Sequence, residues 1–201
     1  MIAANAMFND LSSPLSLLET RRSAKPRDMI APGPDEAQLC HILAIASRTP
    51  DHGKLAPWRF ITVNEDQRPK LEAKLREAYL LAKPDAGRLE LESIHEFAHQ
   101  APSLVIVLSV PRTDSQIPVW EQELSAGAAC MNLLSAAHAL GFTACWLTGW
   151  AAYSNAVRDL FGGPGTRIAG FMFIGSPSRP LEERPRPEFG SVVQTWTPPS
   201  A

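Results

Sequence analysis

The amino-acid sequence predicts a single globular domain that contains both helices and strands. Its 201 residues fit one domain, and 45% hydrophobic with 20% charged residues is the composition of an ordinary folded protein. Segments with the apolar spacing of a helix alternate with short runs of β-branched residues. We therefore expect helices packed around a sheet, without internal repeats.

The expected elements follow one another along the chain as far as Gly175. Helices are expected at residues 14–22, 35–48, 66–82, 88–100, 119–140 and 152–161. Strands are expected at residues 59–63, 103–110, 143–147 and 167–175. The proline- and glycine-rich residues 25–34 and the loop 49–57 separate the first elements.

In the first half of the chain, the starts and apolar faces of the elements can be identified. Pro14 stands near the start of the first helix, and Asp35 begins the second. The apolar positions fall on one face of a helix: Leu39, Ile42, Leu43 and Ile45 in the second helix, and Leu71, Leu75, Tyr79 and Leu80 in the third. Residues 59–63 alternate and are β-branched, which favours a strand.

In the second half of the chain, proline and glycine residues mark where the expected helices end. The helix at 88–100 stops before Pro102, and the long helix ends at Gly141, a common C-cap residue. The helix at 152–161 ends at Gly162-Gly163. Residues 103–110 form the most apolar run, with the length of a buried strand.

Residues 176–201 form a proline-rich tail that has few helix or hairpin signals. Such a segment does not pack well on its own, yet it carries Phe189, Val192, Val193 and Trp196. We expect these side chains to be buried against a second copy of the chain, which the tail wraps.

Composition and charge exclude several classes of partner. A net charge of −2 gives no basic surface for nucleic acid, and no apolar run reaches the roughly 18 residues that span a membrane. The N-terminus lacks the pattern of a signal peptide. The 3 cysteines are far apart and form no disulfide framework, and Cys40 and Cys130 are expected as buried thiols. Reduced thiols indicate the cytoplasm.

Residues 95–99, His-Glu-Phe-Ala-His, match the H-E-x-x-H pattern of zinc peptidases. On a helix the two histidines would lie one turn apart and could hold zinc, with Glu121 or Glu123 as a third ligand. However, the helix ends directly afterwards, and its expected core face, Ile94, Phe97, Ala98 and Ala101, leaves both histidines towards solvent. We therefore expect no metal ligands, and a zinc peptidase is the weakest alternative.

Two segments place hydrogen-bonding groups at turns. Arg21-Arg22-Ser23 offers guanidinium donor forks and a hydroxyl, which suit a phosphate. Arg48-Thr49-Pro50-Asp51-His52 puts an imidazole in a loop after a helix, which suits a planar polar ligand. Each segment alone could equally be solvated surface.

Together with three further blocks, these segments resemble the nitroreductase family of flavin enzymes, most closely its YdjA-like branch. The further blocks are Trp120 to Gly127, Gly141-Phe142 with Trp146-Leu147-Thr148-Gly149, and Gly170-Phe171 to Gly175-Ser176-Pro177. The resemblance covers residues 14–197. It implies an α+β fold with a largely antiparallel sheet between helices, and an intertwined homodimer with FMN at the subunit interface.

The resemblance also implies roles for individual residues. Arg21, Arg22 and Ser23 would hold the FMN phosphate and ribityl end from one subunit, and Arg48 and His52 would reach the flavin from the other. Trp146, Leu147 and Thr148 would line the cofactor. The nicotinamide coenzyme would be associated with the end of the long helix, at Ala136, Ala137, His138, Ala139, Leu140 and Gly141.

The sequence departs from the broader family at two points. Lys54-Leu55-Ala56 stands where many members have Asn-x-Gln before Pro57-Trp58, and Lys54 could supply positive charge near the flavin ring. Arg184 and Arg186 could be the terminal basic residues that reach the phosphate; both could also be solvated.

The implied activity is electron transfer from NADH or NADPH, through FMN, to nitroaromatic or quinone-like small acceptors by a ping-pong mechanism, without a catalytic side chain. Two alternatives remain open: a flavin-binding protein without enzymatic activity, and a reductive dehalogenase-like enzyme. Such relatives usually add a lid, which residues 83–118 could hold.

Overall fold

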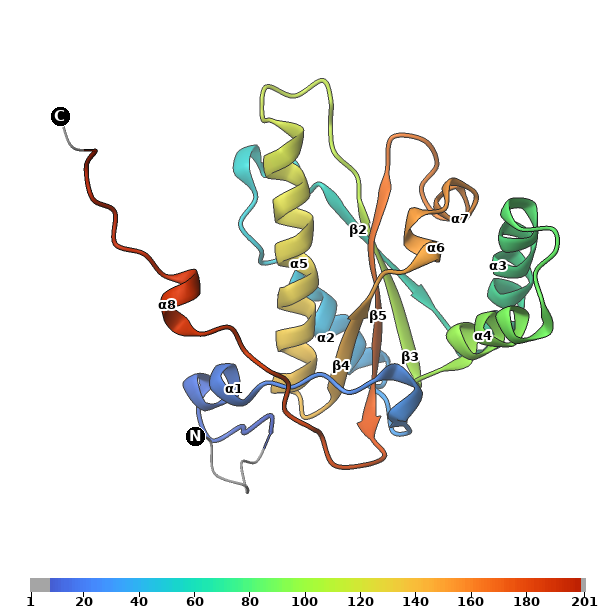
Figure 1. The fold of residues 1–201 in the computed structure, drawn as a ribbon, viewed down its shortest axis with the longest axis horizontal. Helices are drawn as coiled ribbons and strands as arrows, with labels where there is room; N and C mark the ends of the chain where they lie inside the picture. The colour runs from blue at the N-terminus through green and yellow to red at the C-terminus, as the bar shows by residue number, and fades with distance from the viewer. Residues whose placement is uncertain (1–7, 200–201) are drawn as a thin grey trace.

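A five-stranded antiparallel sheet forms the centre of the protein, which a computed structural model describes over residues 8–199 (Figure 1). The strands are β1 (Met29–Ile30), β2 (Trp58–Val63), β3 (Ser103–Ser109), β4 (Thr143–Leu147) and β5 (Arg167–Pro177). They are ordered β1-β5-β3-β2, and β4 pairs with β5. All pairs are antiparallel, so the expected α+β fold is confirmed.

Helices cover both faces of this sheet (Figure 1). They are α1 (Pro14–Thr20), α2 (Glu36–Ala46), α3 (Arg68–Ala82), α4 (Arg88–His99), α5 (Val119–Ala139), α6 (Trp150–Tyr153), α7 (Asn155–Asp159) and α8 (Phe189–Val192). Single 3-10 turns lie at Pro26–Asp28, His52–Lys54 and Glu65–Gln67. In the described chain, no helix is both long enough and apolar enough to cross a membrane.

The alternation of side chains along β3 divides the core in two. Leu104, Ile106 and Leu108 face α3, α4, α6 and α7, together with Phe171 and Phe173 of β5. Val105 and Val107 face the opposite way and pack with α2 and α5. Both sets are fully buried, because a central strand covered on both faces has apolar side chains at every position.

Local sequence signals account for most boundaries. Asp35 caps α2 by accepting a hydrogen bond from the Gln38 amide at 2.8 Å, and the Gln38 side chain accepts from the Asp35 amide at 3.0 Å. At the end of α5, Gly141 has φ 86°, and the Phe142 amide donates to the Ala137 carbonyl at 3.0 Å. The predicted glycine C-cap is therefore confirmed.

Three sequence expectations differ from the structure. The helix expected at 152–161 is two short helices, because Ser154 caps α7 by accepting a hydrogen bond from the Val157 amide at 3.3 Å. The two-residue strand β1 was not expected, since its pairing with Ser176 and Pro177 is a long-range contact. Cys130 is buried as expected, but Cys40 is exposed, so the expectation of a buried Cys40 is wrong.

Several large apolar side chains remain exposed on one protomer. Trp120, Leu124 and Met131 form a stripe along α5, and Leu15 and Leu18 lie on α1. In the tail, Phe189 is 76% and Trp196 is 78% exposed, together with Val192 and Val193. Exposed apolar surface of this extent indicates an interaction site. The tail runs away from the sheet past α1, with α8 as its one short helix in the described residues (Figure 1).

Candidate functional site

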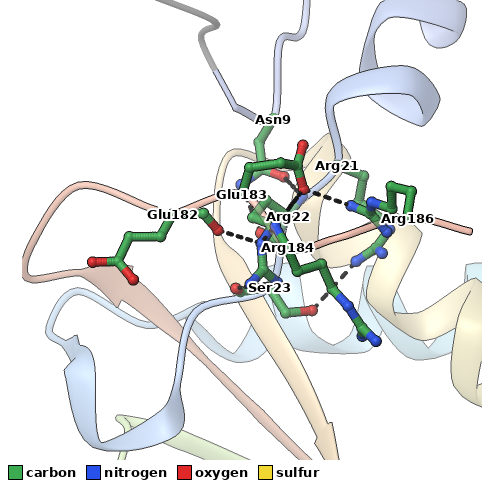
Figure 2. Close-up of polar contacts among 8 residues, drawn as sticks. All are labelled: Asn9, Arg21, Arg22, Ser23, Glu182, Glu183, Arg184 and Arg186. Atoms are coloured by element: carbon green, nitrogen blue, oxygen red, sulfur yellow. Dashed lines mark hydrogen bonds and ion pairs between the residues drawn. The ribbon is translucent and has the colours of Figure 1, made fainter. Parts of the chain in front are cut away.

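Four arginines meet where the segment after α1 crosses the start of the tail (Figure 2). Arg21 and Arg22 come from the first segment, and Arg184 and Arg186 come from the tail. We call these four the arginine cluster. The Arg21 guanidinium donates to the Ser23 hydroxyl at 3.3 Å, and Arg22 Nε donates to the Glu182 carbonyl at 2.5 Å. The tail therefore completes a site that the N-terminal motif begins.

The charges of the arginine cluster are not balanced within the described chain. Burial, and then repulsion from Arg186, Arg22 and Arg184, lower the pKa of the Arg21 guanidinium, and Glu183 opposes this effect. The Glu182 carboxylate points away from the arginines (Figure 2). Guanidiniums gathered in this way favour a phosphate, which each can bind through two parallel hydrogen bonds.

The structure adds two cations that sequence reasoning missed. A cavity beside the cluster is lined by Arg22, Ser23, Lys25, Asp28 and Arg179, among others. Lys25 follows the Arg-Arg-Ser motif closely in the sequence, so its basic charge was a usable signal. Arg179 pairs with Asp28, which no local pattern reveals, because the pairing of β1 with β5 brings these residues together.

The cluster leads directly to β4. The Ala24 amide donates to the Thr143 hydroxyl at 3.2 Å, which fixes the motif at the first residue of this strand. In the described chain β4 pairs with β5 alone, so one edge of the strand offers unpaired backbone groups. The predicted residues Trp146, Leu147 and Thr148 follow along the same strand.

Trp146 lies in a slot that two glycines create. Its indole nitrogen donates to the Ala169 carbonyl at 2.9 Å, and a β-carbon at Gly170 would overlap the ring. Gly127 of α5 also faces the ring, with 3.9 Å between a β-carbon built there and the indole. A groove of about 770 Å³ extends from Trp146 past Thr148 and Tyr153 to Arg167.

The second predicted segment, residues 48–58, is fixed against α5. The Ser125 hydroxyl donates to the Pro50 carbonyl at 2.7 Å, and the His52 Nδ1 lies 2.8 Å from Glu121 Oε2. The Asp51 carboxylate accepts hydrogen bonds from the Leu55 and Ala56 amides at 3.1 and 2.7 Å. These contacts hold an exposed His52 in a defined loop.

The backbone of this loop is strained. Lys54 has φ 56° and Ala56 has φ 46°, in the left-handed region that costs a residue with a β-carbon about 1–2 kcal/mol. Such conformations persist where the surroundings enforce them, and they cluster at functional sites. The strain therefore singles out the loop, and Lys54 within it is exposed.

Within one protomer the two predicted segments are not brought together. His52 contacts Glu121 in the first turn of α5. Arg21 lies near His138 in the last turn, and the pKa of His138 is lowered chiefly by burial and to a smaller extent by repulsion from Arg21. Those two α5 residues are about 25 Å apart, at about 1.5 Å per residue. Figure 1 shows the arginine-bearing segment and the 48–58 loop at opposite ends of α5.

The first half of the segment predicted to contact the nicotinamide is buried within one protomer, and the second half is at least partly exposed. Ala136, Ala137 and His138 are buried, and His138 has a pKa lowered to about 4, chiefly by burial. Ala139 and Gly141 are exposed, and Leu140 is partly so. In one protomer, exposed surface in this segment is therefore limited to residues 139–141, and the assignment of residues 136–141 to the coenzyme stays a prediction.

Comparisons with known proteins agree with this geometry. Residues 18–176 match the sequence profile of the nitroreductase family. The chain is 37% identical over 174 residues to the Haemophilus influenzae "Putative NAD(P)H nitroreductase", covering 86% of this chain and 92% of that protein. It is 34% identical over 164 residues to the Escherichia coli K12 "Putative NAD(P)H nitroreductase YdjA", covering 81% and 87%.

Solved structures share the fold at lower sequence identity. A nitroreductase-like protein from Bacillus cereus superposes with a TM-score of 0.76 at 20% identity, over 92% of this chain and 96% of that chain. A nitroreductase with bound FMN from Bacteroides fragilis superposes with a TM-score of 0.67 at 21% identity, over 92% and 99%. From the matched profile and the identity to both relatives, the chain belongs to the nitroreductase family.

Proposed function

We propose that this protein is an FMN-dependent oxidoreductase that passes electrons from NADH or NADPH to a small planar acceptor. The observation that carries the proposal is the arginine cluster near the start of β4, where four guanidiniums gather around the single carboxylate of Glu183, beside a cavity that Arg22 and Ser23 line. Family membership supports the same cofactor, since a nitroreductase of the same fold has bound FMN.

The chain's own residues would hold the cofactor along β4. Arg21, Ser23 and the tail arginines bind the phosphate, and the exposed edge of β4 supplies backbone groups to the rest of the molecule. Neighbouring side chains on a strand point to opposite faces of the sheet. Trp146 therefore points towards α5, while Leu147 packs in the core on the other face, which also contains Phe171 and Phe173. When bound, FMN supplies the hydride chemistry, and the protein supplies position and electrostatics.

We propose that the site is completed by a second copy of the chain. Glu121 and Ser125 of α5 hold the 48–58 loop, and Gly127 faces Trp146. With about 3.6 residues per turn, the exposed stripe of Trp120, Leu124 and Met131 lies between these two faces. A partner packed on the stripe would carry its own loop towards Trp146, so Arg48, His52 and Lys54 would serve the other subunit's flavin.

The exposed tail fits the same arrangement. Phe189, Val192, Val193 and Trp196 have no core of their own, and burying them on a partner would add to an interface of the obligate kind, which covers on the order of 2,000 Å² or more. The tail also supplies Arg184 and Arg186, so dimer formation and phosphate binding would be linked. The domain thus comprises residues 14–197 with the tail wrapped around the partner.

We propose a ping-pong mechanism with nitroaromatic or quinone-like acceptors. The sequence lacks a glycine-rich fingerprint for a dinucleotide, so the nicotinamide would stack on the flavin where the acceptor later stacks. The groove beside Trp146 offers about 770 Å³ next to the strand. Within residues 83–118, α4 and β3 occupy residues 88–99 and 103–109, which leaves residues 83–87 and the loop 110–118 as the stretches that a lid could use.

Visible spectroscopy and anaerobic stopped-flow kinetics test this function. The purified protein should carry the absorbance of bound FMN, and NADH or NADPH should bleach it without oxygen. Parallel double-reciprocal lines with a quinone acceptor would then indicate ping-pong transfer. A protein that binds FMN but is bleached by neither coenzyme contradicts the reductase proposal and favours a flavin-binding or dehalogenase-like role.

A further inference from the structure

The H-E-x-x-H motif lies on α4, and its histidines face α3. His95 Nδ1 lies 2.9 Å from Glu72 Oε2, and His99 Nε2 lies 3.1 Å from the same oxygen. The two imidazole rings are 4.6 Å apart between centroids, with 32° between their planes. Two histidines at i and i+4 therefore converge with a carboxylate from the neighbouring helix on one point.

The third ligand is not one of the residues that the sequence offered. Glu121 pairs with His52, and Glu123 lies 3.7 Å from Arg167, so neither is available to α4. Glu72 precedes His95 by 23 residues. It lies on α3 and reaches the histidines because α3 packs on α4. The sequence pattern did not indicate Glu72 as a third ligand, and its position beside the two histidines changes the expectation that they bind no metal.

We propose that Glu72, His95 and His99 form a surface site for a divalent first-row transition metal such as zinc. Their ligand atoms all lie within 4.8 Å of one another. Around a tetrahedral zinc with bonds of about 2.0–2.1 Å, neighbouring ligand atoms are about 3.3 Å apart. The nitrogen-to-oxygen distances of 2.9 and 3.1 Å therefore need to widen by a few tenths of an ångström.

The surroundings favour this set of ligands. Arg76 Nη1 donates to Glu72 Oε1 at 3.3 Å, which orients the carboxylate and leaves Oε2 directed at the histidines. A neutral imidazole has one unprotonated nitrogen, and exchange of its tautomer turns that nitrogen towards the metal. Two nitrogens and one oxygen suit zinc, nickel or copper, whereas magnesium and calcium prefer oxygen ligands throughout.

The position of the site indicates a stabilising role. The side chains are 58%, 32% and 18% exposed for His95, His99 and Glu72, which leaves the remaining coordination positions open to water. Figure 1 shows α3 and α4 on the side of the sheet away from α5 and the tail. A metal here would join α3 to α4 without reaching the arginine cluster, so the site does not depend on the proposed flavin chemistry.

Calorimetric titration of untagged, flavin-loaded protein with zinc chloride tests the site. We expect one binding event in the wild type that is weakened at least about tenfold by His99→Ala or Glu72→Gln, because each removes a ligand. His41→Ala is the matched control, since His41 is an exposed histidine on α2. The same event should raise the Tm of the wild type and of the control, because a metal that binds only the folded state stabilises it.

Flavin absorbance confirms that each variant is folded before titration. A wild type that binds no zinc overturns the proposal, as does equal binding by the wild type and by both ligand variants. Loss of the event in His41→Ala with retention in His99→Ala would place the metal elsewhere and would also overturn it.

Discussion

At the scale of single residues, Arg21 interacts electrostatically with charged groups from both ends of the chain, while its neighbour Arg22 makes the direct contacts with the tail. The Arg21 guanidinium is partly buried beside three others, and their mutual repulsion disfavours the charged state. An anion with two negative charges would reverse that repulsion, so the same contacts that weaken the free cluster would stabilise a phosphate complex. Glu183 offsets part of the repulsion in the free protein, through its pairs with Arg22 and Arg186, and a bound phosphate would offset more of it.

Arg21→Ala should lower the affinity for FMN about ten- to a hundredfold, which corresponds to the loss of about 1.5–3 kcal/mol for a charged hydrogen bond. The change should leave the fold intact because no core contact is removed. Fluorescence titration with FMN measures the affinity. Arg88→Ala is the control, since Arg88 is an exposed arginine on α4, and equal losses in both variants would refute the role of Arg21.

His138 makes the stability depend on pH. Burial lowers its pKa from 6.5 to about 4, while its Nδ1–H donates to the Phe142 carbonyl at 3.1 Å. The unfolded chain therefore binds the extra proton first, and the contribution of His138 is present above pH 6.5 and lost as the pH falls towards 4. From pH 7 to pH 5 the wild type should lose about 2 kcal/mol more than His138→Gln.

Urea denaturation at both pH values measures this difference. His138→Gln should be less stable than the wild type at pH 7, because the buried hydrogen bond is disturbed, but its stability should fall less on acidification. Two denaturation midpoints that shift in parallel with pH would show that His138 does not titrate in this range.

At the scale of elements, the loop 50–58 contains residues with strained, left-handed backbone angles. The hydrogen bonds that the Asp51 carboxylate accepts and the Ser125 hydroxyl donates hold the loop in this conformation. Ala56 has φ 46°, which glycine adopts without a steric cost. Ala56→Gly should therefore stabilise the fold by about 1 kcal/mol, because relief of left-handed strain exceeds the entropy that glycine adds to the unfolded chain.

Ala73→Gly provides the matched comparison, since Ala73 is exposed in the middle of α3. There the same substitution should destabilise by about 1 kcal/mol, the difference in helix propensity between alanine and glycine. Chemical denaturation measures both variants. A destabilised Ala56→Gly variant would show that the positive φ carries no strain.

The sequence predicted the helices and strands better than it predicted the contacts between residues from different elements. Periodicity located α3, α5 and all the longer strands, because each signal is contained in one short segment. The strand β1 and the pairs Arg179–Asp28 and Glu72–His95 were missed, since both partners are distant along the chain and neither has a pattern that points to the other. The sequence offered both parts of the arginine cluster in different ways: the motif near α1 is a local pattern, whereas Arg184 and Arg186 were suggested only by the family resemblance, since no pattern in the tail points to Arg21.

At the scale of the whole molecule, the proposed dimer assigns the two halves of the site to different protomers. A mixture of Arg21→Ala and His52→Ala chains should then form some dimers with one intact site and one doubly altered site. Coexpression of the two variants, with a different affinity tag on each, isolates such heterodimers. Their reductase activity should approach half that of the wild type and exceed that of either homodimer.

Activity no higher than that of the homodimers would mean that each site draws both residues from one chain. A heterodimer with wild-type chains provides the upper reference, and the FMN content of each preparation normalises the rates.

The tail gives a second test at this scale. Deletion of residues 188–201 removes Phe189, Val192, Val193 and Trp196 but keeps Arg184 and Arg186. The shortened chain should dissociate into monomers at concentrations at which the full chain is dimeric, because apolar area of the interface is lost. Sedimentation velocity measures this, and an unchanged dimer would assign the tail to another partner.

The slot that holds Trp146 has an evolutionary consequence. Because a β-carbon at position 170 would overlap the indole, position 170 cannot accept a larger residue while Trp146 is present, whereas Gly170 tolerates smaller side chains at position 146. Lineages that replace the tryptophan with a small side chain gain room at position 170, whereas those that keep it must retain glycine there. The two positions are therefore expected to covary among descendants of this gene, with the identity of one restricting the history of the other.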